Sequence, residues 1–156
     1  MGNNEVIQKA RAALSTGDLK GAESLLISVL DQDPSDFEGR YTMAVLHRTR
    51  GEHALAKNSL SKLMSEKPDF GRGFQELGYC ELALNSEPDA QIAFEKAVKL
   101  DSSLIDSWRF LSALYQRQKD HRAEQAERQV AFLNELPLEL RTVISYLAAN
   151  RLADAE

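Results

Sequence analysis

The amino-acid sequence predicts an all-α protein in which helical hairpins stack side by side into a solenoid. Small and apolar residues recur every 34 residues in one register, which is the mark of a repeat array. Glycine or asparagine recurs at the same spacing, where a helix can end in the left-handed conformation. Proline, which a helix cannot continue through, stands in two successive periods. The positions that keep this register are Ala22, Ala56 and Ala90; Leu26, Leu60 and Phe94; Val29, Leu63 and Ala97; Gly17, Gly51 and Asn85; and Pro34, Pro68 and Ser102.

The second period shows how one unit is built. A first helix carries apolar side chains at helical spacing before Gly51 ends it. A second helix follows, and Pro68 ends that one. The inward positions of the two helices are Met43, Ala44, Leu46 and His47, and then Ala56, Leu60 and Leu63. Such a hairpin leaves apolar faces uncovered when it is alone, so stacking of successive hairpins is expected to bury them.

The third and fourth periods carry the clearest family pattern. The third has Phe74, Leu77, Gly78, Ala90, Phe94 and Ala97 in sequence, and the fourth opens with Trp108, Leu111 and Tyr115. Over residues 3–118 this pattern resembles the tetratricopeptide repeat, although the first unit, with Val6, Lys9, Ala10 and Ala13, matches weakly. The resemblance implies a right-handed superhelix of antiparallel hairpins, whose first helices line a concave groove that binds a peptide or partner segment.

The register slips in the fourth hairpin. Lys119 and Glu124 fall on positions that elsewhere hold glycine or asparagine and alanine, whereas Ala123 lies one residue early. A shortened turn at the sequence QKDH is therefore expected, followed by a second helix within residues 121–136. We predict four hairpins over residues 1–136.

Residues 137–156 are predicted to form the first helix and partial second helix of a fifth hairpin, or a capping helix. Leu140, Val143, Ile144 and Leu147 lie on one helical face, and Asn150 takes the place that Gly17 has in the first unit. Two readings stay open. The chain is a piece of a longer array, or the last helix is the cap and RLADAE is a frayed tail.

Composition limits the classes of function. The 156 residues carry a net charge of −5, which argues against a general nucleic-acid surface. No apolar run is long enough to span a membrane, and MGNNEVIQ lacks the core of a signal peptide, so a cytoplasmic protein is expected. The single cysteine, Cys80, allows no internal disulfide.

Motifs for chemistry are weak. His47 occupies a packing position, His53 and His121 have no cysteine cluster nearby, and Cys80 lies in the middle of a helix. No glycine-rich phosphate loop occurs. We therefore predict no catalytic residue, no metal and no cofactor, and a protein that is not an enzyme.

The predicted binding residues are those first-helix positions that the packing pattern leaves free of the core. They are Arg11, Leu14, Tyr41, Val45, Arg48, Arg72, Gln75, Tyr79, Leu82, Arg109 and Gln116. Tyrosine and arginine are favoured in binding hot spots. The arginines suggest a partner with carboxylate or phosphate groups, and pairing with neighbouring glutamates is the equally weighted alternative.

Three hypotheses follow for the function. The leading one is a protein-interaction scaffold, although the two-carboxylate clamp of co-chaperone arrays is not supported, because only Arg72 fits among Ile7, Arg11, Thr42, Arg72 and Glu76. The second is the N-terminal repeat region of a larger bacterial-type enzyme, since residues 136–156 are similar to the transition that precedes a sulfotransferase domain. The third is self-association as a homodimer through the C-terminal hairpin.

Overall fold

The computed structural model describes residues 2–153, with side chains up to residue 147. These residues form helices and no strand, which confirms the all-α prediction. The helices are α1 (Asn3–Thr16), α2 (Leu19–Gln32), α3 (Phe37–Thr49), α4 (His53–Glu66), α5 (Gly71–Ala83), α6 (Glu87–Leu100), α7 (Ile105–Gln118), α8 (Ala123–Glu135) and α9 (Leu138–Ala153). The contacts divide the chain into two compact units, Met1–Glu66 and Lys67–Glu156, which are described separately below.

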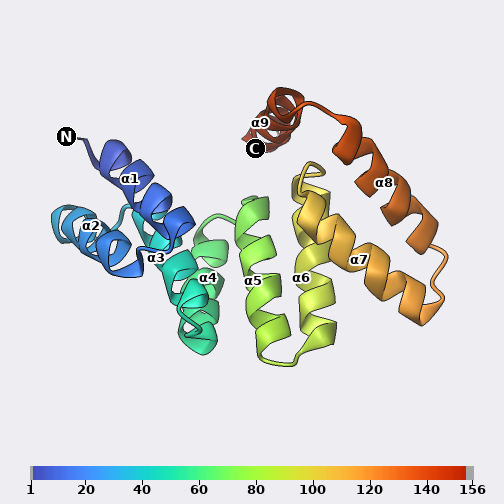
Figure 1. The fold of residues 1–156 in the computed structure, drawn as a ribbon, viewed down its shortest axis with the longest axis horizontal. Helices are drawn as coiled ribbons and strands as arrows, with labels where there is room; N and C mark the ends of the chain where they lie inside the picture. Colours follow the sequence, from blue (N-terminus) through green and yellow to red (C-terminus); the bar gives the residue numbers. More distant parts are fainter. Residues whose placement is uncertain (1, 154–156) are drawn as a thin grey trace. The chain divides into compact units, whose positions relative to one another are not determined.

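Each unit is built from antiparallel helical hairpins (Figure 1). In the first unit α1 pairs with α2 and α3 pairs with α4; in the second, α5 pairs with α6 and α7 pairs with α8. The predicted small-residue position is confirmed, because Ala22, Ala56 and Ala90 are all fully buried. A methyl group at this position lets the two helices of a hairpin approach closely.

Successive hairpins are joined in a regular way within each unit. The first helix of a hairpin packs on the second helix of the hairpin before it, as α3 does on α2 and α7 does on α6. The four-residue connections that precede these helices are ordered by Asp33 and Asp101, whose carboxylates accept hydrogen bonds from the backbone N–H of Ser35 and Ser103.

The left-handed position is kept in every hairpin. Gly17, Gly51 and Asn85 have φ angles of 83°, 88° and 61°, as the spacing predicts. Lys119 also fills this position with φ of 53°, so the expectation that it does not suit the position is wrong. A non-glycine residue is held there at a cost of about 1–2 kcal/mol, which the surrounding packing offsets.

The slip in the fourth hairpin is an insertion and not a shortening. Helices α2, α4 and α6 begin two residues after their left-handed residue, whereas α8 begins four residues after Lys119, at Ala123. The extra residues let Asp120 accept a hydrogen bond from the backbone N–H of Arg122. As a result Ala126, and not Ala123, takes the fully buried place that Ala90 has in the third hairpin.

Helix α9 differs from the sequence prediction at its end. It continues through Asn150 to Ala153, so Asn150 does not end a helix as expected. The predicted start of a further helix at residues 154–156 lies outside the described residues. Whether α9 opens a fifth hairpin or caps the array stays a prediction.

Candidate functional site

The eleven predicted binding residues differ widely in exposure. Arg72, Arg109 and Gln116 are exposed. The other eight are half-buried or buried: Arg11, Leu14, Tyr41, Val45, Arg48, Gln75, Tyr79 and Leu82. The expectation that Tyr41 lies away from the core is wrong, because the residue is only 9% exposed.

In the first unit, α3 engages two of the predicted residues of α1. The Arg11 guanidinium donates hydrogen bonds to the Glu38 carboxylate at 2.5 Å and to the Thr42 hydroxyl at 3.3 Å. Leu14 packs against the cluster that contains Ala10 and Leu46. The positive charge of Arg11 is therefore met inside the protein, which favours the pairing alternative for this arginine.

In the second unit, the predicted residues of α5 also make internal contacts. Gln75 accepts a hydrogen bond from the Ser107 hydroxyl at 2.8 Å. The rings of Tyr79 and Phe94 meet edge to face with centroids 5.3 Å apart, and Leu82 packs on the same cluster. Gln75 therefore bonds α7 directly, and Tyr79 and Leu82 pack on the cluster that α7 shares with α6.

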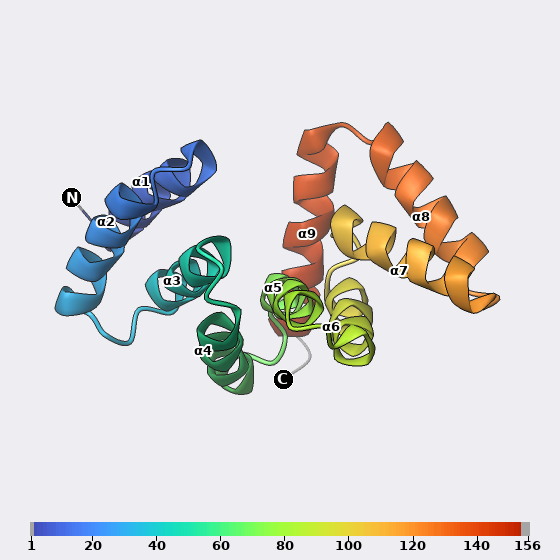
Figure 2. The ribbon, with the colours of Figure 1, turned by 60° about the horizontal axis from the view of Figure 1, so that its bottom comes forward.

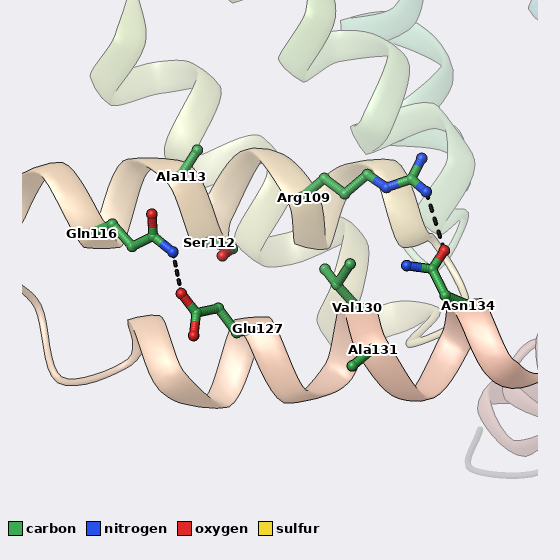
Figure 3. Close-up of a pocket in the computed structure, with 8 residues that line it drawn as sticks. All are labelled: Arg109, Ser112, Ala113, Gln116, Glu127, Val130, Ala131 and Asn134. Atoms are coloured by element: carbon green, nitrogen blue, oxygen red, sulfur yellow. Dashed lines mark hydrogen bonds between the residues drawn. The ribbon is translucent and has the colours of Figure 1, made fainter.

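On α7 the corresponding positions border an open hollow of about 340 Å³ between α7 and α8 (Figure 3). We call the residues that line it the α7–α8 face. They are Arg109, Ser112, Ala113, Gln116, Glu127, Val130, Ala131 and Asn134. Two of the predicted binding residues, Arg109 and Gln116, lie here. The other six residues that line the hollow were not predicted.

The α7–α8 face has an apolar middle between two polar ends. Figure 3 shows Gln116 bonded to Glu127 at one end and Arg109 reaching Asn134 at the other. The Arg109–Asn134 hydrogen bond is 3.1 Å long, and Arg109 also pairs with Asp106 at 3.0 Å. Both partners of that ion pair are more than half exposed, so it stabilises the fold by at most about 1 kcal/mol and a ligand can replace it.

The repeat identifies the counterparts of these residues in the preceding hairpin. The four α7 residues stand 34 positions after Gln75, Gly78, Tyr79 and Leu82 of α5. The four α8 residues stand 36 positions after Gln91, Phe94, Glu95 and Val98 of α6, because of the two-residue insertion.

The counterpart face on α5 and α6 is filled by α7. Phe94 meets Phe110 with ring centroids 4.6 Å apart, and Glu95 accepts a hydrogen bond from the Tyr115 hydroxyl at 2.7 Å. On the α7–α8 face, Val130 takes the place of Phe94 and Ala113 takes the place of Tyr79. These side chains are smaller, and no helix of the described part of the chain packs on this face, so a hollow remains where the earlier hairpin is filled.

A polar network behind the face fixes the turn between α7 and α8. The Arg122 guanidinium lies 4.2 Å from the centre of the Tyr115 ring and bonds to Asp120 at 2.8 Å and to Glu95 at 3.0 Å. The hydrogen bond from Arg122 lowers the pKa of Asp120 from 3.8 to about 2. Burial raises the pKa of Glu95, but hydrogen bonds from Gln91, Tyr115 and Arg122 outweigh burial and leave it below its usual value.

The network predicts a pH dependence of stability. Because both carboxyl pKa values are lower in the folded state, their contribution is present above about pH 4 and is lost as the pH falls towards 2. We expect Arg122→Gln to lower the melting temperature at pH 7 and to reduce its fall between pH 4 and 2. Circular dichroism melts across this range test this. Arg128→Gln, which removes an exposed pair with Glu124, is the control, and an equal effect of both variants would contradict the assignment.

The described residues offer little for metal or membrane chemistry. Within residues 2–147, no group of three His, Cys, Asp or Glu side chains is placed to hold a metal ion. His47 meets Glu52 through a 2.5 Å hydrogen bond, and Cys80 is fully buried. No helix in the described part of the chain combines the length and apolar character needed to cross a membrane.

Comparison with solved structures agrees with this geometry. The fold is that of a tetratricopeptide-type array. A double mutant of MamA from strain RS-1 superimposes with a TM-score of 0.68 at 23% identity, covering 85% of this chain and 75% of that one. MamA of Desulfovibrio magneticus RS-1, from residue 41 to its end, gives 0.65 at 22% identity, with 86% and 75% covered. MamA of AMB-1 gives 0.62 at 19% identity, with 92% and 79% covered.

These similarities establish the fold of the chain, since MamA is a tetratricopeptide-like helical repeat protein. No family model and no curated protein matches the sequence.

Proposed function

We propose that this chain is a protein-interaction scaffold without enzymatic activity, working in the cytoplasm, which binds a helical partner segment on the α7–α8 face. The observation that carries the proposal is the repeat equivalence of this face with the face on α5 and α6, which holds α7. A surface that receives a helix in one hairpin and is open in the next is suited to a helix from another source.

The residues of the face indicate the chemistry of the partner. Ala113, Val130 and Ala131 leave room for apolar side chains at helical spacing, such as leucine or valine. Arg109 gives the rim a cation, which can exchange its exposed partner Asp106 for a carboxylate or phosphate group of the partner. We therefore propose an amphipathic helix that carries an acidic group beside its apolar face.

Photo-crosslinking at the face tests the proposal. We expect a photoreactive phenylalanine derivative at position 113 to capture a partner segment, because Ala113 is exposed within the hollow. The same group at position 12 is the matched control, since Ala12 is an exposed alanine in the middle of α1. Ala113→Asp should abolish capture by a bystander crosslinker at position 116 while the helical content stays unchanged. Equal capture at positions 12 and 113 would overturn the proposal.

A further inference from the structure

Helix α9 carries the docking pattern of a first helix. Counted from the start of each helix, α9 stands 33 residues after α7, which begins at Ile105. Among the α7 residues that contact α5 or α6 are Ser107, Phe110 and Leu111, and their counterparts on α9 are Leu140, Val143 and Ile144. All three counterparts are apolar, so α9 has side chains with which a first helix can pack on the preceding hairpin.

This docking face of α9 is largely uncovered in the single chain. Leu140, Val143 and Leu147 are 49%, 49% and 48% exposed and Ile144 is half-buried, whereas Leu111 and Leu114 of α7 are 1% exposed. Among the described residues, α9 has no extended packing contact with another helix, and Figures 1 and 2 show it diverging from α8. Within the second unit, to which α9 belongs, the Ser145 hydroxyl donates a 2.6 Å hydrogen bond to the Asp101 carboxylate.

The connection before α9 explains why it leaves its own hairpin. Four residues join α2 to α3, α4 to α5 and α6 to α7, but two residues, Leu136 and Pro137, join α8 to α9. Leu136 is extended with ψ of 133°, and the proline ring fixes the next φ angle. A connection this short, without the aspartate-centred turn of Asp33 or Asp101, does not reproduce the path that brings α3 and α7 back onto the preceding hairpin. Short hinges of this kind favour exchange of the element between two chains.

We propose that α9 of a second copy of this chain docks on the α7–α8 face, and that the exchange is reciprocal in a symmetric dimer. This inference rests on the proposed function, because it names the helix that the face receives. The apolar residues of α9 are the counterparts of the α7 residues that fill the same face of the preceding hairpin, so the face would receive the kind of side chain that its counterpart holds.

A cysteine crosslinking experiment tests the proposed pairing. Val130 and Val143 are the counterparts of Phe94 and Phe110, whose rings are in contact, so cysteines at these positions are expected to lie within reach of a short bismaleimide crosslinker in the dimer. Full-length Val130→Cys and Val143→Cys chains, mixed and treated with this reagent, should form a crosslinked mixed dimer. Cys80 is fully buried and does not interfere. In the control mixture Ile92→Cys, at an exposed position of α6, replaces Val130→Cys and should give no mixed dimer.

Sedimentation equilibrium of the full chain is a second test of the proposed dimer. The wild-type chain should reversibly dimerise, and Val143→Asp should weaken dimerisation by about tenfold or more because docking would bury an unpaired carboxylate. Ile92→Asp should leave dimerisation unchanged. A monomeric wild-type chain, equal crosslinking yields in the two mixtures, or an internal crosslink in a monomeric Val130→Cys/Val143→Cys chain would each overturn the inference. If the wild-type chain is monomeric and the photoreactive variant at position 113 captures a different protein, the proposed function holds while this inference fails.

Discussion

Replacing Phe94 by alanine is expected to lower the free energy of unfolding of the second unit by about 3–5 kcal/mol. Phe94 is fully buried, and its ring meets those of Tyr79 and Phe110. It therefore joins α5, α6 and α7, and its removal leaves a cavity where the two hairpins meet. Urea denaturation followed by circular dichroism measures the effect.

A substitution at Gly78 tests whether the Phe94 ring requires a glycine beside it. A Cβ atom at position 78 would lie 2.8 Å from three atoms of the Phe94 ring, closer than carbon atoms can approach. Gly78→Ala should therefore destabilise the wild-type chain by about 1–3 kcal/mol. In the Phe94→Ala background the same change should stabilise it by up to about 1 kcal/mol, because alanine favours a helix over glycine. An effect of the same sign in both backgrounds would show that the ring does not require glycine.

Replacing Ala56 by leucine is expected to destabilise the first unit by about 1–3 kcal/mol. Ala56 is fully buried where α4 packs against α3, so a larger side chain must push the two helices apart. The measurement is again the midpoint and slope of urea denaturation.

Ala54→Leu is the matched control for this change. It lies two residues away in the same helix and is exposed, so an effect within about 0.5 kcal/mol of zero is expected. If the two variants were equally stable, the 34-residue register would not mark the contact between helices.

The repeat itself could be predicted from the sequence because its signals are local. Glycine at positions 17 and 51 ends helices for conformational reasons that need no tertiary context. Lys119 could not be foreseen in the same way, because lysine has no preference for a positive φ angle. It is held there by the turn that follows, in which Arg122 bonds Asp120 and Glu95 and stacks on Tyr115.

The candidate site could be predicted only in part for a related reason. The sequence predicts a free groove at first-helix positions outside the core, but Arg11 of α1 bonds Glu38 of α3, and Gln75 of α5 bonds Ser107 of α7. Arg109 and Gln116 are open because no helix of the described chain takes that place on α7. The α8 half of the face, from Glu127 to Asn134, depends on the two-residue insertion. This half of the face could therefore be identified only once the structure of the turn was known.

A methyl NMR titration tests most directly whether the α7–α8 face receives a helix. The receiver is the full Val143→Asp chain, whose own α9 should not compete, and the probe is a synthetic peptide of residues 137–153. We predict saturable shifts of the Ala113, Val130 and Ala131 methyl signals, with no shift at the exposed controls Ala12 and Ala54. Unchanged signals at Ala113, Val130 and Ala131 at saturating peptide, or shifts confined to other methyl groups, would contradict the account.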